Sequence, residues 1–310
     1  MSFAPVVMFV YNRADHFSRT FEALSRCPEA AQSDLYVFSD GAKRDKDAEK
    51  VSEVRAAVEQ GKKTSRFQSI TVYESPVNRG LAASVIAGVT EVIEKYGRVI
   101  VLEDDCVPSP YFLKYMNQCL EYYREDRKVG SIAGYTPQLA FPESFKDDVF
   151  FAYRSCSCGW ATWKECWDNV DWDLAEIGDF YRSPELIRKL NANGNDRFIR
   201  LYRQTGGNGS SWSVRFGAHL VRHDWLTVYP RYSYIQNIGC DASGVHSKAE
   251  DAASMRVDLS KAIENVRLCP VTVLPEIQRI MKKHYSCGVL SDLKRWAAVK
   301  AIVLKERRKG

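Results

Sequence analysis

The chain has 310 residues, of which 45% are hydrophobic, 12% aromatic and 27% charged. This composition supplies a large buried core and excludes a disordered chain, a collagen and a small disulfide-bonded scaffold. The 44 Lys and Arg residues exceed the 39 Asp and Glu residues by a net charge of only +5, which is too mild to indicate a nucleic-acid partner.

The sequence carries no evident targeting or anchoring segment. No window supplies the roughly 18 apolar residues of a membrane span, and Met1–Tyr11 lacks the basic start and cleavage site of a signal peptide. The nine cysteines form no evident disulfide framework. We therefore expect a cytoplasmic protein with reduced, buried thiols. Cys156 and Cys158 could instead suggest a metal or redox pair, but no second Cys or His pair at zinc spacing accompanies them.

Strand and helix patterns alternate through the first hundred residues. In chain order, the pattern predicts a strand at Ala4–Tyr11, a helix at His16–Cys27, a strand at Leu35–Phe38, a helix at Asp45–Gln60, a strand at Ile70–Tyr73, a helix at Leu81–Tyr96 and a strand at Val99–Leu102. This alternation predicts an α/β fold, with a parallel sheet and helices on both of its faces.

The second half of the chain loses this regular alternation. We expect, in order, a helix at Tyr111–Tyr123, strands at Gly130–Ala133 and Val149–Tyr153, a loop at Gly206–Gly209, a helix at Trp212–His223, a strand at Leu226–Tyr229 and a loop at Asn237–Lys248. The chain therefore reads as one continuous α/β domain with an elaborated C-terminal half, followed by a tail from near Leu259.

Polar and charged side chains follow the predicted strands of the first half. They are Asn12, Arg13, Asp40, Asn78, Arg79, Glu103, Asp104 and Asp105. Ligands of open parallel sheets bind at the carboxyl ends of the strands, and arginine with hard carboxylate oxygens suits a nucleotide diphosphate and its divalent cation. The acids could instead cap the helix that begins near Pro110. The chain lacks G-x-G-x-x-G and Walker lysine motifs, which argues against dinucleotide and P-loop sites.

Several of these segments resemble a known family. Pro5–Arg13, Ser39-Asp40-Gly41, Asn78-Arg79-Gly80 and Val99–Pro108 together resemble the nucleotide-sugar glycosyltransferases of the GT-A fold. The segment Leu102–Asp105 followed by Pro110-Tyr111-Phe112, together with Tyr153-Arg154 and Gly159-Trp160, resembles N-acetylglucosaminyltransferase I. Tyr229-Pro230 and Asn237-Ile238-Gly239 resemble bacterial glycosyltransferases from surface-polysaccharide gene clusters. The resemblance covers roughly residues 4–248.

The resemblance implies a Rossmann-like GT-A domain over residues 1–258, with a nucleotide-binding half at 1–136, an acceptor half at 137–258 and a helical tail at 259–310. It also implies a metal-dependent transfer of a sugar from a nucleoside-diphosphate donor, first of all a UDP-sugar. The acceptor would be a hydroxyl of a bacterial glycan or lipid-linked oligosaccharide, and no nucleic acid would take part. Two alternatives remain, a sugar nucleotidyltransferase and a non-catalytic carbohydrate-binding protein derived from the fold.

The resemblance also assigns roles to individual residues. Asp105 would bind Mn²⁺ or Mg²⁺, Asp104 would accept from ribose or sugar hydroxyls, and Glu103 would act in catalysis by orienting the sugar. Asp40 would accept the N3–H of a uracil-like base, while Arg13, with Asn12 and Arg79, would approach the nucleotide. His246 would be a second metal ligand. Without a ligand, Arg13 could form an ordinary ion pair and Asp40 an Asp-Gly turn.

The general base is the main departure from the inverting relative, which carries an aspartate just after a tryptophan. Here Trp212-Ser213-Val214-Arg215 has no carboxylate at that place, and serine without a partner is a poor base. Either another residue serves, with Asp241, Asp224 and Asp173 as candidates, or the reaction retains the anomeric configuration. We take Asp241 as the predicted catalytic residue.

Two further segments have alternative interpretations. The tryptophans at 160, 163, 167 and 172 could stack on an acceptor sugar, or their spacing could mark the buried face of a helix. We expect two of the four to be core, with Gly159-Trp160 at a helix start touching the sugar. The basic, amphipathic segment Val289–Gly310 suits an anionic membrane surface at the inner face of the cell membrane. It could also be a solvated terminal helix or a disordered end.

Overall fold

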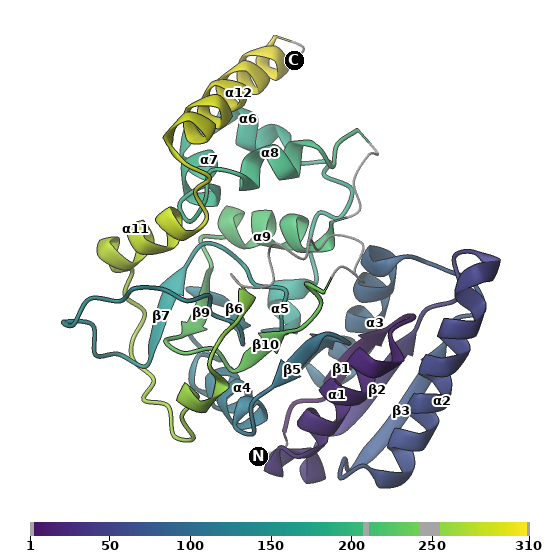
Figure 1. The fold of residues 1–310 in the computed structure, drawn as a ribbon. Helices are drawn as coiled ribbons and strands as arrows, with labels where there is room; N and C mark the ends of the chain where they lie inside the picture. The colour runs from purple at the N-terminus through teal and green to yellow at the C-terminus, as the bar shows by residue number, and fades with distance from the viewer. Residues whose placement is uncertain (1–2, 207–210, 242–254, 309–310) are drawn as a thin grey trace.

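A computed structural model describes residues 3–206, 211–241 and 255–308. Eight strands form one sheet in the order β3-β2-β1-β4-β8-β6-β9-β7 (Figure 1). The strands are β1 (Val6–Val10), β2 (Asp34–Ser39), β3 (Ser69–Glu74), β4 (Arg98–Glu103), β6 (Val129–Ala133), β7 (Val149–Ala152), β8 (Trp160–Trp163) and β9 (Leu226–Pro230). A separate antiparallel pair joins β5 (Cys106–Pro108) to β10 (Ile235–Asn237).

The sheet is mostly parallel, as expected. The pairs β1–β2, β2–β3, β1–β4 and β6–β9 are parallel, whereas β8 runs antiparallel to both β4 and β6, and β7 runs antiparallel to β9. Each strand and helix predicted in the first hundred residues is present, with its ends displaced by a few residues. The α/β fold with helices on both faces is therefore confirmed.

Alternation of side chains along the strands builds a core on each face of the sheet. Val6, Met8 and Val10 of β1 pack with α1 (Ala14–Ser25), α2 (Ala48–Thr64) and α4 (Phe112–Tyr122). Val7 and Phe9 of the same strand pack on the other face with α3 (Leu81–Tyr96) and α9 (Trp212–Arg222). Because successive strand residues face opposite sides, one fully buried strand serves both cores.

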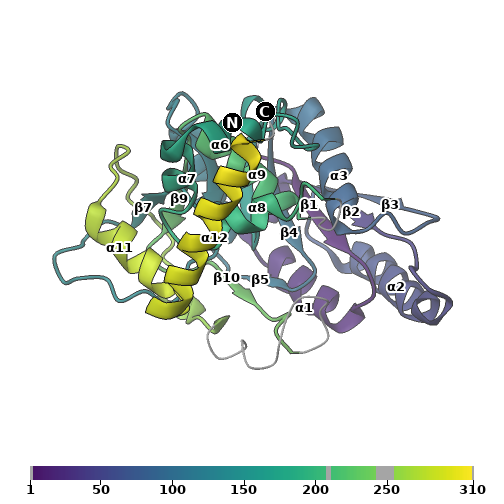
Figure 2. The same cartoon turned by 90° about the horizontal axis from the view of Figure 1, so that it is seen from above.

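The second half adds short helices around α9. They are α5 (Lys164–Trp167), α6 (Gly178–Arg182), α7 (Pro184–Leu190) and α8 (Arg197–Tyr202), and short 3₁₀ turns occur at Pro28–Gln32, Asp45–Asp47 and Leu259–Lys261. Phe180, Phe198 and Val214 belong to a third core between these helices. Two later helices, α11 (Pro275–His284) and α12 (Val289–Arg307), lie beside this half of the molecule (Figures 1 and 2).

The tryptophan segment differs from its prediction. Trp160 to Trp163 form strand β8 rather than the start of a helix, so Trp160 and Trp163 point to opposite faces of the sheet. Trp160, Trp163 and Trp167 are all buried, which makes three core tryptophans instead of two. The Trp160 ring packs against Trp212 with centroids 5.0 Å apart. The helix start expected at Gly159-Trp160 is therefore wrong, and other rings cover the Trp160 side chain. A contact of this backbone with a sugar stays a prediction.

The residues after 258 pack closely on the preceding sheet. Val266, Leu268 and Val271 lie against the main core, and Ile277 and Met281 of α11 are buried. The expected helical character of this region is correct for α11 and α12, while the division at residue 258 stays a prediction. No helix in the described part of the chain is long and apolar enough to span a membrane.

Candidate functional site

One arginine, Arg13, joins the residues that follow β1 to the acids at the end of β4. Arg13 directly precedes α1, and its Nη2 donates to Asp104 Oδ1 and, at 2.9 Å, to Asp105 Oδ2. The backbone holds the pair in place, because Asp104 N donates to Phe9 O and Thr20 Oγ1 donates to Asp104 O. The sequence prediction that these side chains share one edge of the sheet is thus fulfilled in the geometry.

The environment shifts the protonation of this cluster. Burial raises the pKa of Asp104 to about 6, against the opposing effect of Arg13, while the neighbouring Asp105 raises it further. The two carboxylates in turn raise the pKa of Arg13 above its ordinary value, although its burial acts in the opposite direction. The cluster is therefore an arginine clamped between two carboxylates, with one positive charge facing two acids.

Glu103 stands apart from the other two acids. It pairs with Phe9 in the β1–β4 register, and it follows Val99 and Val101, which face the α3 side of the sheet. Arg13 contacts Asp104 and Asp105 instead. Burial, followed by repulsion from Asp105 and Cys158, raises the pKa of Glu103 well above that of an ordinary glutamate. This carboxyl therefore tends to hold a proton, which a general acid or hydrogen-bond donor requires.

Asp40 joins two loops at the edge of the sheet. Its Oδ1 accepts from the backbone N–H of Gly41 at 2.9 Å and of Arg79 at 2.8 Å. Its Oδ2 accepts from Gly80 N at 2.9 Å and from Asn78 Nδ2 at 3.1 Å. These four bonds explain the turn that the sequence indicated. A contact with a nucleotide base would have to replace one of them, and it stays a prediction.

The remaining predicted nucleotide contacts lie nearby. Asn12 follows β1 and is partly buried beside Arg13, and Arg79 has an exposed side chain. Asn12 follows β1 and Arg79 follows β3, two parallel strands that are separated in the sheet by β2. Their contact with a nucleotide stays a prediction.

The end of β10 and the residues after it contact Asp105. Asn237 Nδ2 donates to Asp105 Oδ1 at 3.3 Å, and Ile238 N donates to Asp105 O at 2.8 Å. At Gly239, an added Cβ would lie 2.1 Å from Asp105 Oδ2. Only glycine lets the backbone come so close to the carboxylate.

Asp241 reaches the same edge of the sheet. Its Oδ2 lies 3.2 Å from His16 Nε2 on α1, and its side chain is 47% exposed. His16 in turn is close enough to Asp104 to lower that residue's pKa. Asp241 is therefore the base candidate that the fold brings to the acidic cluster. His246, the predicted second metal ligand, lies outside the described residues, as do 207–209 of the predicted glycine-rich loop and 242–248 of the later loop.

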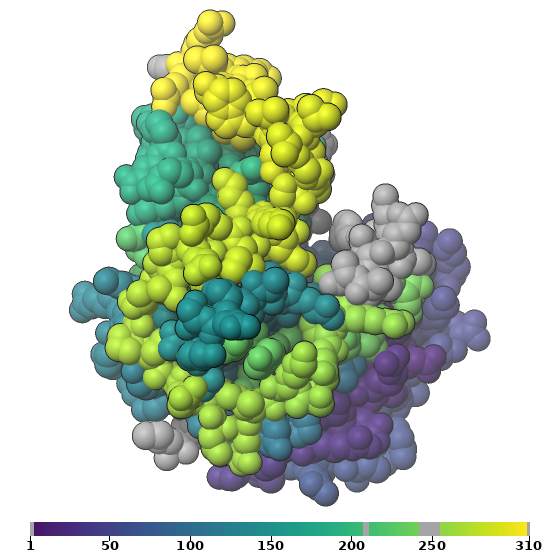
Figure 3. Space-filling view, turned by 60° about the vertical axis from the view of Figure 1, so that its left-hand side comes forward, coloured from purple at the N-terminus to yellow at the C-terminus, as the bar shows by residue number. Residues whose placement is uncertain are grey.

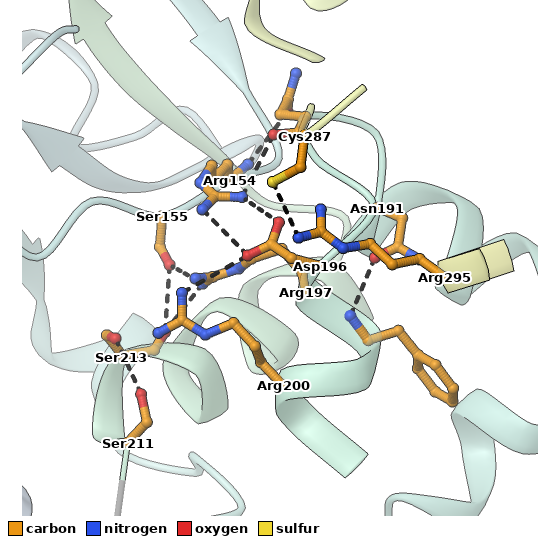
Figure 4. Close-up of polar contacts among 12 residues, drawn as sticks. Arg154, Ser155, Asn191, Asp196, Arg197, Arg200, Ser211, Ser213, Cys287 and Arg295 are labelled. Atoms are coloured by element: carbon orange, nitrogen blue, oxygen red, sulfur yellow. Dashed lines mark hydrogen bonds and ion pairs between the residues drawn. The ribbon is translucent and has the colours of Figure 1, made fainter. Parts of the chain in front are cut away.

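The other base candidates face elsewhere. Asp224 lies past the C-terminal end of α9 and accepts from Lys189 at 2.7 Å and from Tyr153 Oη at 3.2 Å. Asp173 is exposed in the connection before α6. At the N-terminal end of α9, arginines surround the place where the inverting relative has its base (Figure 4). Arg197 Nη2 donates to Ser213 O at 3.4 Å and Ser155 Oγ at 3.2 Å.

Sequence reasoning missed several contacts of the site. His16 was counted only as part of a helix, although its place one turn after Arg13 puts it on the same side. Cys106 and Cys158 were expected to be buried thiols, with a metal or redox pair as the alternative for Cys158, and all nine cysteines are free. Cys106 Sγ nevertheless lies 3.5 Å from Asp105 Oδ1, and Asn237 Nδ2 lies 3.7 Å from Cys158 Sγ. The adjacency of Cys106 to Asp105 in the sequence was the available signal.

The site has few potential metal ligands of its own. In residues 3–206, 211–241 and 255–308, no group of three or more His, Cys, Asp or Glu side chains could hold a metal ion. Mg²⁺ and its relatives are commonly bound through only one or two carboxylates together with substrate phosphates. Asp105 and Asp104 fit this donor set, because both place carboxylates at the strand end and the single Arg13 compensates only one of their two charges.

The comparisons agree with this geometry. Residues 6–145 match the model of glycosyl transferase family 2, a stretch that includes Arg13, Asp40 and the three acids at the end of β4. No curated protein matches the chain. The first half of the chain is therefore similar to this class of glycosyltransferases, and the mostly parallel α/β sheet agrees with the expected GT-A fold. The specific resemblance to N-acetylglucosaminyltransferase I receives no support beyond this class.

Three solved structures are similar over part of their length. The mannosyltransferase PcManGT from Pyrobaculum calidifontis, in complex with GDP-Man and Mn²⁺, is 15% identical with a TM-score of 0.40 over 55% of this chain and 48% of that one. TarS from S. aureus is 12% identical with a TM-score of 0.43, over 74% and 36%. Glucosyl-3-phosphoglycerate synthase from Mycobacterium tuberculosis is 10% identical with a TM-score of 0.32, over 53% and 58%. The chain thus spans about half or less of the length of the first two.

Proposed function

We propose that this chain transfers a sugar from a nucleoside-diphosphate donor, first of all a UDP-sugar, to a hydroxyl of a bacterial glycan or lipid-linked oligosaccharide. The observation that supports this most is the pairing of Arg13 with Asp104 and Asp105 at the joined ends of β1 and β4. That cluster lies inside the segment that matches glycosyl transferase family 2. It offers a cation for phosphate and carboxylates for a metal or for sugar hydroxyls at one edge of the sheet.

Donor binding would rearrange the charges of this cluster. The Arg13 guanidinium would turn from the carboxylates toward the diphosphate, where its planar donors match phosphate oxygens. Asp105, with Asp104 beside it, would hold Mn²⁺ or Mg²⁺, and that cation would supply stabilisation of the negative charge on the leaving diphosphate. Asn237 would keep the Asp105 carboxylate oriented, since it donates to Oδ1.

Two acids are available for the sugar side of the reaction. Asp241 would take the proton of the acceptor hydroxyl, and its Oδ2 lies 3.2 Å from His16 Nε2. Glu103 would orient the donor sugar and, while protonated, could donate a hydrogen bond to it. If Asp241 serves as the base, the reaction inverts the anomeric configuration. Retention would instead leave Asp241 without a role in proton transfer.

The C-terminal helix supports a site of action at the inner face of a membrane. Leu290, Leu293 and Trp296 of α12 are more than half exposed, and basic side chains are interspersed along the same helix. Val299, Ile302 and Val303 attach its second half to the domain. A peripheral contact with anionic lipid would bring a lipid-linked acceptor close to the enzyme.

Hydrolysis or transfer by the purified protein tests the proposal. A panel of UDP- and GDP-sugars with Mn²⁺ should include one donor from which the protein releases nucleoside diphosphate, and Asp241→Asn should slow this release when acceptor is present. Asp173→Asn is the matched control, because Asp173 is an exposed acid away from the cluster. Nucleotide binding without any turnover over the whole panel would favour the carbohydrate-binding alternative. Formation of a nucleotide-sugar from a sugar 1-phosphate and a nucleoside triphosphate, with release of pyrophosphate, would favour the nucleotidyltransferase.

A further inference from the structure

A cavity of about 260 Å³ lies away from the acidic cluster. Residues 136–139 and Phe141 form one wall, and Arg231 to Ser233, with Val257, Asp258 and Lys261, form the other. It opens on the face shown in Figure 3, between the teal segment that follows Thr136 and the yellow-green segment around Lys261. Its volume suits a single sugar ring better than a nucleotide.

Two cationic side chains, Arg231 and Lys261, line the cavity. In the described part of the chain, neither Arg231 nor Lys261 forms an ion pair, and Arg231 Nε is buried without a hydrogen-bond partner. The nearby Asp148 is engaged by Arg267 at 3.1 Å. Asp258 also lines the cavity, where Lys261 acts on its carboxylate and its Oδ1 accepts from Ser260 N at 3.0 Å and from Ser260 Oγ at 2.6 Å. The two cations of the lining therefore outnumber its one carboxylate.

Aromatic rings hold both cations in the cavity. The Arg231 guanidinium lies 5.4 Å from the ring centroid of Phe145 and 5.5 Å from that of Tyr232, and Lys261 Nζ lies 5.9 Å from the Tyr232 ring. Tyr232 is 39% exposed, so part of this ring is open to a ligand. A flat aromatic surface next to fixed cations and the polar Gln138 is a combination that suits a sugar ring carrying a negative group.

The cavity is connected to the acidic cluster through β10. Ser233 lines the cavity, and Asn237, four residues further on, donates to Asp105. Four residues span at most about 14 Å of extended chain. Val257, also in the lining, donates from its backbone N to Gln236 Oε1 at 2.8 Å. The cavity wall at Ser233 therefore lies within about 14 Å of Asn237, a distance that an acceptor of several sugars can bridge.

We propose that this cavity is a distal acceptor subsite that binds a sugar unit bearing a carboxylate or phosphate, with Arg231 and Lys261 neutralising its charge and Tyr232 packing on its ring. The identification of the ligand as part of the acceptor rests on the proposed function. The binding of an anionic sugar at this cavity does not.

The test is binding of defined probes, measured by isothermal titration calorimetry at fixed ionic strength. The probes are trigalacturonate, glucose 1-phosphate, inorganic phosphate and the neutral maltotriose. We expect at least one of the two anionic sugars to bind at least tenfold more tightly than maltotriose and inorganic phosphate. If maltotriose binds as tightly as the anionic sugars, the site does not require a negative charge on its ligand. If inorganic phosphate binds as tightly, the site does not require a sugar. If neither anionic sugar binds, the proposed site is wrong.

Substitutions then locate the binding. Lys261→Glu should weaken the anionic sugar at least tenfold, and it is expected to fold because Lys261 is exposed. Arg231→Lys keeps a cation and should weaken binding less than Arg231→Gln. Lys63→Glu, on the exposed side of α2, is the matched control and should change nothing. Unchanged affinity in Lys261→Glu and Arg231→Gln would overturn the assignment.

A separate measurement distinguishes this inference from the proposed function. The Lys261→Glu protein should bind UDP with Mn²⁺ as wild type does, whereas Asp105→Asn should keep its affinity for the anionic sugar. If the anionic sugar binds but no donor is ever turned over, the subsite stands and the proposed transfer fails. If a donor is turned over but the sugar probes do not bind, the subsite fails alone.

Discussion

A methyl group at Gly239 perturbs the acidic cluster directly. In Gly239→Ala, the new Cβ would lie 2.1 Å from Asp105 Oδ2, 2.9 Å from Asp105 Cγ and 3.1 Å from Arg13 Nη1. Carbon and oxygen cannot approach so closely, so either the carboxylate turns away from Arg13 or the segment after β10 moves. Overpacking of this kind costs about 1–3 kcal/mol of unfolding free energy. The alanine also restricts the unfolded chain, which returns about 0.4–1 kcal/mol.

A double-mutant cycle isolates this contact. In the Asp105→Ala background the obstructing carboxylate is absent, so Gly239→Ala should become neutral or slightly stabilising. The coupling free energy between the two positions, measured by urea unfolding, should therefore be about 1–3 kcal/mol in magnitude. The same alanine should weaken UDP binding in Mn²⁺ at least tenfold. Equal destabilisation by Gly239→Ala in the wild-type and Asp105→Ala backgrounds would refute the argument that the backbone at Gly239 packs against the Asp105 carboxylate.

Three further predictions concern stability and surface binding. Burial, with repulsion from His223 and Arg222, lowers the pKa of His219 to about 4. The histidine of the unfolded chain has its ordinary pKa of about 6.5 and binds more protons at pH 5, so the free energy of unfolding should fall by about 2 kcal/mol from pH 7 to pH 5. His219→Gln should reduce this dependence on pH in urea unfolding. Asp196→Asn should cost about 3 kcal/mol in the same assay, because it leaves the buried Arg154, which it pairs with at 3.0 Å, without its carboxylate. Removal of 289–310 should reduce binding to anionic vesicles in a sedimentation assay, and the binding of the full chain should weaken as salt rises; equal sedimentation of both proteins would contradict the membrane role.

The first half of the fold was largely predictable because its signals are local. The apolar runs at β1 and β4 are buried on both faces, as parallel strands require, and each is followed by the charged residues that the fold collects at one edge. The positions of Asp104 and Asp105 could be predicted from the end of β4 alone. Their contact with Arg13 depends on β1 lying next to β4 in the sheet, and the sequence of neither segment shows that order.

The second half was less predictable because its contacts are distant in sequence. The tryptophans suggested a helix by spacing, yet the segment is held as strand β8 between β4 and β6, which lie far from it along the chain. Tertiary pairing overrides local spacing in such a case. The approach of Gly239 to Asp105 spans more than one hundred residues, and glycine in a polar segment did not by itself reveal what it approaches.

The most direct test of the central claim is equilibrium binding of UDP with and without Mn²⁺. The claim is that Asp105 binds the cation that holds the donor diphosphate, so Mn²⁺ should tighten UDP binding at least tenfold in the wild type and have little effect in Asp105→Asn. Asp147→Asn changes an exposed acid outside the cluster and should retain the full effect of the metal. An equal tightening by Mn²⁺ in Asp105→Asn and wild type would contradict the account.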